Sequence, residues 1–219
     1  MDTTTAVPTR NSRSSPTATE PAADEPLAPG RRERKKLATR SALEEAALRL
    51  FASRGFEATT IEDITEAADV SLRTFFRYFA SKEDVLLAEH AEDLVRMREM
   101  LAVASDDLAP MALIAEVLGG LAGAAEDRHD ALLARIRVID SAPSLHARQL
   151  ENYAGFERAI AEAVARRKGT DPTHDLDAVL CGVVGMAAIR SAITVWVAGD
   201  GKEDLTTLLE SALSRVQLV

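Results

Sequence analysis

The sequence predicts an all-α protein of about nine helices, in which an N-terminal three-helix head precedes a larger helical body. Three observations support this fold class. Ala and Leu are abundant while aromatic residues make up only 4% of the chain, a composition that favours helices over strands. Apolar residues recur at i, i+3, i+4 and i+7 in one window after another. No run of β-branched residues alternates with polar ones at the two-residue period of a strand.

Residues 1–30 are rich in Thr, Ser, Pro and Ala and have almost no large apolar side chains. We therefore expect a disordered tail, and the segment lacks the apolar core of a secretory signal. A basic run follows at residues 31–36. By itself such a run suits a solvated helix start. Directly ahead of a DNA-binding unit, a contact with the phosphate backbone or the minor groove is favoured.

A long helix is predicted over residues 33–54. Its apolar positions fall on one face: Leu43, Ala46, Ala47, Leu50 and Phe51. Gly55 is a suitable stop, because glycine readily adopts the conformation that ends a helix.

Residues 56–82 predict two short helices joined by a tight turn. Thr60 suits the N-cap of the first helix, and Asp63 three residues later completes an imperfect capping box. Asp69 tolerates the turn conformation, and Ser71 suits the N-cap of the second helix. The spacing is typical of a helix-turn-helix unit over residues 59–78.

On a helical wheel, the second of these helices has one apolar and one polar side. Phe75 and Phe79 are i, i+4 neighbours, and Leu72 falls beside them on the packed side. Arg77 points the opposite way, flanked by Arg73, Thr74 and Phe76. Arginine can donate two hydrogen bonds to guanine, and threonine can contact thymine or phosphate, so the helix suits a major groove. The alternative is a helical hairpin whose arginines are only solvated.

The distribution of charge supports DNA binding although the whole chain carries a formal charge of −9. Residues 31–82 contain 11 Lys and Arg against 8 Asp and Glu, a net of +3. Residues 83–219 contain 13 against 23, a net of −10. A locally basic head therefore precedes an acidic body, and the local charge is what meets phosphates.

The body is predicted to consist of six helices, at residues 82–104, 110–126, 130–141, 144–168, 175–198 and 203–217. The first begins after the N-cap candidate Ser81 and links the head mechanically to the body. Gly119, Gly120 and Gly123 weaken the second. They indicate either close helix packing or open space beside a ligand.

The predicted helix at residues 175–198 is apolar on every side. A membrane span is disfavoured, because Arg190 near its middle would cost about 2.5–3.5 kcal/mol. Burial against a second copy of the chain is the better interpretation. With the helix at 203–217, it would form a four-helix homodimer interface in which Gly182 and Gly185 permit close approach.

The order of these parts resembles the TetR family of bacterial transcriptional regulators. The matching residues are LFASRGFEATTIEDITEAADVSLRTFFRYFASKEDVL, at positions 50–86, within a match that extends over residues 31–90. Three positions depart from the family pattern. Phe76 stands where Tyr is common, Arg73 where a small residue is usual, and Asp69 where the turn usually has Gly. The body resembles the family only in architecture.

The resemblance implies roles for individual residues. Thr60 would touch phosphate, Leu72 would reach bases or sugar despite its place on the wheel, and Tyr78 and Lys82 would contact the backbone. The complete set of candidate DNA-binding residues is Arg31, Arg32, Arg34, Lys35, Thr60, Ser71, Leu72, Arg73, Thr74, Phe76, Arg77, Tyr78 and Lys82.

Residues 91–219 are expected to bind a small-molecule effector and to dimerise, and residues 31–90 to bind DNA. The candidate ligand-binding residues are Met97, Met111, Leu118, Ile136, Arg137, Ile139, His146, Tyr153, Phe156, Ile160, Met186, Arg190 and Trp196. For most of them a place in the ordinary core, or a surface hydrogen bond, is the alternative. An apolar pocket with an arginine would suit an amphipathic acid or an acyl thioester.

We therefore expect a homodimeric, ligand-responsive regulator that represses transcription from a pseudo-palindromic double-stranded DNA operator. An activator, or a DNA-binding protein without an effector, remains the alternative. The four His residues form no metal-ligand spacing and no catalytic motif is present, so we expect no metal, no cofactor and no enzyme activity. A single cysteine, Cys181, excludes a disulfide within the chain and suits the cytoplasm.

Overall fold

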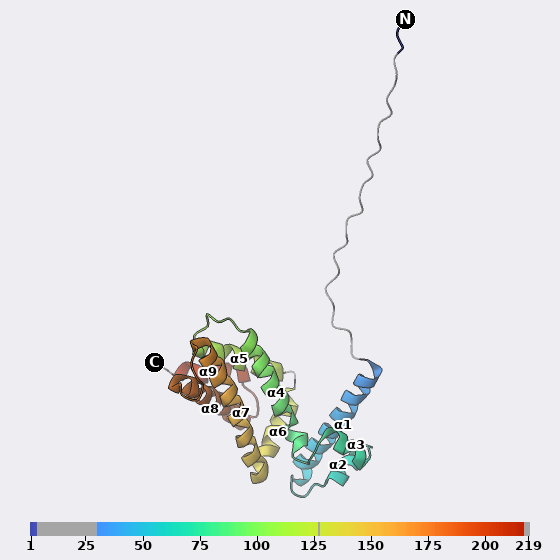
Figure 1. The fold of residues 1–219 in the computed structure, drawn as a ribbon. Helices are drawn as coiled ribbons and strands as arrows, with labels where there is room; N and C mark the ends of the chain where they lie inside the picture. Colours follow the sequence, from blue (N-terminus) through green and yellow to red (C-terminus); the bar gives the residue numbers. More distant parts are fainter. Residues whose placement is uncertain (4–29, 127, 217–219) are drawn as a thin grey trace.

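The computed structural model describes residues 1–3, 30–126 and 128–216, and most of the predicted N-terminal tail lies outside these residues. The described residues form nine helices and no strand, which confirms the predicted all-α fold (Figure 1). The helices are α1 (Arg31–Arg54), α2 (Ile61–Ala67), α3 (Leu72–Tyr78), α4 (Asp84–Val103), α5 (Pro110–Glu126), α6 (His129–Ser141), α7 (Pro143–Lys168), α8 (Leu176–Ala198) and α9 (Leu205–Arg215).

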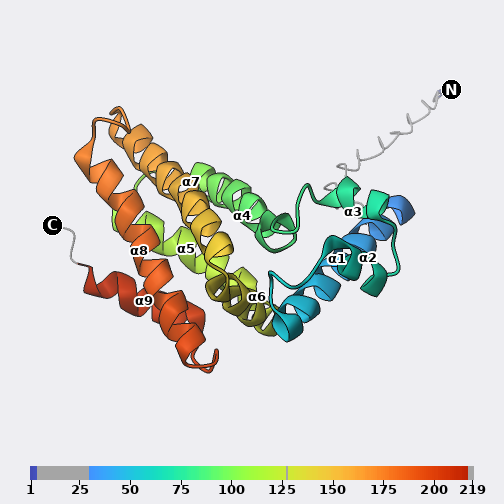
Figure 2. The same cartoon turned by 90° about the horizontal axis from the view of Figure 1, so that it is seen from below.

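Helices α1–α3 form a head at one end of the molecule, and α4–α9 form the body (Figure 1). Helix α4 runs from the head into the body, while α6 lies between α1 and the rest of the body. Helix α8 packs along α7 and against α9 on the side of the body away from the head (Figure 2). A change inside the body therefore has two routes to the head, α4 and α6.

The core of the head includes residues from the body. Phe51, Ile64 and Phe75 pack together from α1, α2 and α3. Leu86 of α4 and Leu145 of α7 belong to the same buried cluster. A three-helix head of about 50 residues buries too little surface for much independent stability, so it depends on the segments that pack against it.

The glycines of α5 have different surroundings. A Cβ atom on Gly120 would lie 2.4 Å from Cε of Met100. At this position the glycine therefore permits close packing of α5 against Met100 of α4. No atom lies within 4 Å of a Cβ built on Gly119 or Gly123. Neither of those two glycines lines the cavity in the body.

The predicted role of Gly182 and Gly185 between subunits is wrong, because both are buried within one chain. A Cβ on Gly182 would lie 2.3 Å from the carbonyl oxygen of Glu157 in α7. A Cβ on Gly185 would lie 3.0 Å from Ile114 in α5. These glycines therefore let α8 approach α7 and α5.

The opposite face of α8 is exposed and carries several large apolar side chains. Its exposed side chains include Leu176, Val179, Leu180, Val183 and Val195. Among the described helices α8 alone is long and apolar enough to cross a membrane, but 39% of its most apolar window is buried inside the protein. The core helix of a soluble protein passes the same test.

Candidate nucleic-acid interface and ligand cavity

The N-terminus of α2 is held by a complete capping box. Thr60 Oγ1 accepts a hydrogen bond from the Asp63 backbone N–H at 3.1 Å. The Asp63 carboxylate accepts from the Thr60 backbone N–H at 2.9 Å and from its hydroxyl at 2.7 Å. These bonds lower the pKa of Asp63. Thr60, the predicted phosphate contact, is therefore fixed at the start of α2.

The turn between α2 and α3 forms as the sequence predicts. Asp69 adopts a φ of 53°, the left-handed conformation that Asp tolerates better than most residues. Ser71 caps α3, because its hydroxyl accepts from the Thr74 backbone N–H at 3.2 Å. Phe75 is completely buried behind the helix. Local signals therefore set the orientation of α3 on the head.

The outer face of α3 is broader than the helical wheel predicts. Arg73, Arg77 and Phe76 are exposed, the last at 55%. Leu72 is also 40% exposed, so its predicted place on the packed side is wrong. Phe79 follows the end of α3 in an extended conformation and stays buried, whereas Leu72 is the first residue of the helix. The outer face therefore includes Leu72, in agreement with the resemblance.

The two arginines of α3 differ in their contacts. Arg77 donates to the Tyr78 hydroxyl at 3.2 Å, and its guanidinium lies 4.9 Å from the centroid of that ring. Among the described residues, Arg73 makes no hydrogen bond or ion pair. Its donors are therefore available to an external acceptor.

Lys82 contacts the chain itself, although it is a predicted contact to the DNA backbone. Its ammonium donates to the carbonyls of Phe56 at 2.7 Å and Thr59 at 2.9 Å. It also lies 4.2 Å from the centroid of the Phe56 ring. In this structure Lys82 positions the turn that leads to Thr60.

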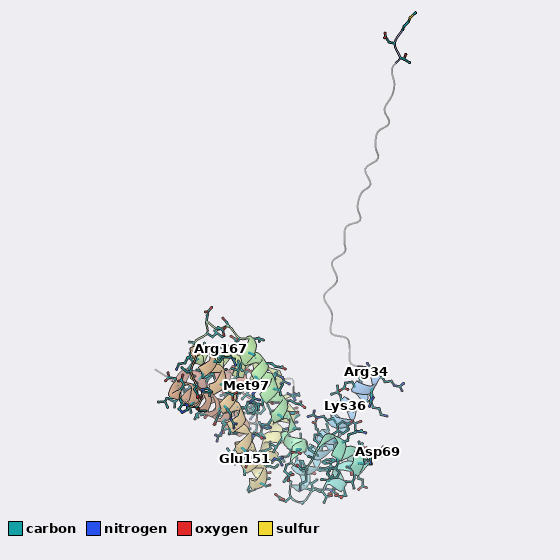
Figure 3. All side chains as sticks on the ribbon, viewed as in Figure 1. Arg34, Lys36, Asp69, Met97, Glu151 and Arg167 are labelled. Carbon is teal, nitrogen blue, oxygen red and sulfur yellow. The ribbon has the colours of Figure 1, made fainter. Side chains whose placement is uncertain are left out.

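The basic run at residues 31–36 is helical from its first residue and forms the exposed start of α1. Lys36 pairs with Glu33 at 3.3 Å. Arg34 and Lys36 extend from the end of α1 that is farthest from α6 (Figure 3). The candidates Arg31, Arg32 and Lys35 are exposed on the same turns.

A cavity of about 150 Å³ lies in the body among α4–α9. It is lined by several of the predicted ligand-binding residues: Met97, Leu118, Ile136, Ile139, Tyr153, Phe156 and Met186. Figure 3 places Met97 inside the body. Five polar residues of the lining were missed by the sequence reasoning: Glu89, His90, Asp93, Arg135 and Gln149.

The other predicted ligand-binding residues lie outside this cavity: Met111, Arg137, His146, Ile160, Arg190 and Trp196. Arg137 pairs with Asp200, and His146 lies 3.7 Å from the Asp140 carboxylate. Met111 packs against the core of the body and Ile160 is buried in that core. The guanidinium of Arg190 lies over the ring of Tyr153, and Trp196 packs on His129.

The missed polar residues lie together on the cavity wall, and two of them, Arg135 and Gln149, are buried. Arg135 is 9% exposed and pairs with Glu89, which also lies 3.0 Å from Arg128. Gln149 is 7% exposed, and its side chain makes no hydrogen bond among the described residues. Burial lowers the pKa values of both His90 and Arg135. One sequence signal could have identified Arg135. It lies three residues after Leu132, so it is a charged residue on an apolar helix face.

Helices α2 and α3, with the capped and exposed α3 as the second of the pair, form a helix-turn-helix DNA-binding unit. Residues 43–88 match the family model described as bacterial regulatory proteins, tetR family. Residues 108–218 match the model described as MftR C-terminal domain. The chain belongs to the TetR family of bacterial transcriptional regulators.

Three relatives illustrate the relationship. The transcriptional regulator TcmR of Streptomyces glaucescens is 34% identical over 200 residues, covering 88% of each chain. MftR of Mycobacterium tuberculosis is 30% identical over 188 residues, covering 84% of this chain and 91% of its own. The crystal structure of the Thermus thermophilus repressor FadR in complex with lauroyl-CoA has a TM-score of 0.53 at 26% identity, covering 82% and 95%.

Proposed function

We propose that the protein is a homodimeric repressor that binds a pseudo-palindromic operator and is released by a small molecule in the body. The observation that carries this proposal is the outer face of α3, where Arg73 has no partner among the described residues and Arg77 is exposed beside it. Residues 31–90 bind DNA, and residues 91–219 bind the effector and dimerise. A DNA target inside the cell agrees with a cytoplasmic location.

The exposed apolar face of α8 supports the dimer. Val179, Val183 and Val195 would lie in water on a single chain. Large exposed apolar side chains gathered on one helix are typical of an interface. A second α8–α9 pair would cover it and form a four-helix bundle, which leaves no apolar surface for a membrane to cover.

The route from the cavity to the head supports the response to a ligand. Glu89 and His90 line the cavity from the first turns of α4. Arg40 of α1 pairs with Glu92, which lies in this part of α4. A ligand that displaces this part of α4 would move the head, and coupling between sites is typically about 1–3 kcal/mol.

The relatives support repression and an apolar effector. The Thermus thermophilus FadR is described as a repressor and was crystallised with lauroyl-CoA. The cavity of this chain likewise has apolar walls, formed by residues such as Leu118 and Met186.

The test is the affinity for DNA upstream of the protein's own gene and of neighbouring genes, measured against scrambled DNA at one salt concentration. We expect specific binding at least about a thousandfold tighter than binding to scrambled DNA. Equal affinities would contradict the operator proposal and favour a DNA-binding protein without sequence preference. Loss of reporter expression on deletion of the gene would instead indicate an activator.

A further inference from the structure

The cavity has a polar end and an apolar end. Glu89 and His90 lie near the start of α4, which is the end that meets the head, whereas Met97 lies two turns further into the body. Arg135 of α6 and Gln149 of α7 complete the polar end. The rest of the wall is almost entirely apolar and comes mainly from α5, α6 and α8. A ligand with one polar group would therefore have a defined orientation.

The charged groups at the polar end are already paired. The Glu89 carboxylate pairs with Arg135 and lies 3.0 Å from Arg128. Asp93 lies 3.0 Å from Arg96. An anionic ligand would meet two carboxylates, and a cationic ligand would meet arginines that already neutralise them. Burying either charge without a free counter-charge is unfavourable.

Hydrogen-bonding capacity at the polar end is unused. The Nε–H of Arg135 is buried without a partner. Gln149 as a residue is 7% exposed, and its amide makes no hydrogen bond among the described residues. Buried donors and acceptors without partners are uncommon in folded proteins. These two groups could bond a ligand hydroxyl or carbonyl.

The size of the cavity restricts the apolar part of the ligand. An apolar cavity of about 150 Å³ holds one benzene molecule, and this cavity is of that volume. A lauroyl chain has twice as many carbon atoms and exceeds that volume. Arg190, which suggested an acidic ligand at the sequence level, lies outside the cavity.

We propose that the cavity binds a compact, uncharged, largely apolar molecule about the size of a single ring, with a hydroxyl or carbonyl group bonded to Gln149 and Arg135. This deepens the proposed function and rests on it, because the same cavity is the effector site. It excludes free carboxylic acids and long acyl thioesters as the preferred class.

The test is titration calorimetry of the full-length protein without DNA, using benzyl alcohol, benzoate and benzylamine. These probes share a ring and differ in charge. Benzyl alcohol should bind at least about tenfold more tightly than either charged probe. Equal or tighter binding of benzoate or benzylamine overturns the proposal, and so does the absence of binding by all three.

Two variants assign the polar contact. Gln149→Leu keeps the side-chain size and should weaken the binding of benzyl alcohol about tenfold, while the binding of toluene stays unchanged. Unchanged toluene binding also shows that the variant is folded. Glu89→Gln should strengthen benzoate binding, because it leaves the charge of Arg135 without a partner. Equal losses for toluene and benzyl alcohol in Gln149→Leu would overturn the assignment.

Failure of this inference can be told apart from failure of the proposed function. If benzyl alcohol binds but the affinity for operator DNA is unchanged by it, the ligand class stands and the response to ligand fails. If specific operator binding is observed but no probe binds, the ligand class fails and the operator proposal stands.

Discussion

The ammonium of Lys82 donates to the backbone carbonyl of Phe56 at 2.7 Å, across 26 residues of sequence. Because Lys82 precedes α4 and Phe56 precedes α2, this bond joins the start of α4 to the turn that positions Thr60. A second bond, to the carbonyl of Thr59 at 2.9 Å, closes the same link. Movement of the start of α4 would therefore be transmitted to the start of α2, where the predicted phosphate contact Thr60 lies.

Replacement of Lys82 by Met keeps most of the side-chain length and removes both bonds. We expect a loss of about 1–3 kcal/mol in unfolding free energy, because two partly buried carbonyls lose a charged donor. Chemical denaturation measures this loss. Lys202→Met is the matched control, since Lys202 is exposed in the loop between α8 and α9. A similar small effect for both variants would mean that the link contributes nothing to stability.

Arg73→Ala tests whether α3 reads base edges. If Arg73 donates to guanine, the variant should lose about 1–3 kcal/mol of operator affinity and relax the preference at one base position. Binding to a set of single-base operator variants measures both effects. Arg98→Ala makes the same charge change on the exposed surface of α4. A uniform loss over all the DNA sequences would show that Arg73 contacts only phosphate.

The glycines of α5 and α8 predict opposite effects of the same substitution. Gly182→Ala should destabilise the protein by about 1–3 kcal/mol, because its Cβ would meet the backbone of Glu157. Gly123→Ala should stabilise it by about 0.5–1 kcal/mol, because alanine favours the helix and the surrounding space is open. Thermal unfolding of the two variants checks the signs. Stabilisation by Gly182→Ala would contradict the close contact of α7 with α8.

His90 should make stability depend on pH. Burial lowers its pKa below the ordinary value of 6.5, against the opposing effects of Asp93 and the Leu87 backbone. The neutral ring is therefore favoured in the folded state, and the unfolded chain binds more protons as pH falls below 6.5. Stability is complete above that pH and declines below it, by at most about 1.4 kcal/mol per pH unit.

The measurement is the difference in unfolding free energy between the protein and its His90→Phe variant from pH 7.5 to 5.5. Phe keeps an aromatic ring and does not titrate, so the variant should lose less stability on acidification. Parallel curves would mean that His90 is protonated as easily in the folded protein as in the unfolded chain.

Val183→Glu should prevent dimerisation, since it places a charge in the centre of the exposed apolar face of α8. Sedimentation velocity at several concentrations measures the mass. Val103→Glu is the control, because Val103 is 85% exposed at the end of α4. A Val183→Glu protein that remains dimeric would place the interface elsewhere.

The sequence was sufficient for the elements whose signals are local. The caps Thr60 and Ser71 and the left-handed Asp69 follow from residue type and spacing, and all three have the predicted conformations. Leu72 was misplaced because a wheel shows only the angle of a residue, and the elements around α3 leave its first residue, Leu72, 40% exposed. Periodicity cannot indicate which neighbours cover the end of a short helix.

The cavity was predicted only in part because its polar end depends on contacts between distant segments. Arg135 and Glu89 come from different helices, and only the folded structure shows that they pair. Arg190 is on an apolar helix but faces outward, because Gly182 and Gly185 determine which side of α8 packs against α7 and α5. Spacing identifies a helix face but not the element that will cover it.

The spacing between operator half-sites tests the central claim most directly. Two heads fixed on one dimer require half-sites about one helical turn apart on the same side of the duplex. Insertion of about 5 base pairs between the half-sites turns one of them to the opposite side. We predict that this insertion reduces the affinity to that of scrambled DNA at the same salt concentration. Undiminished affinity would contradict a homodimer that reads two half-sites through paired α3 helices.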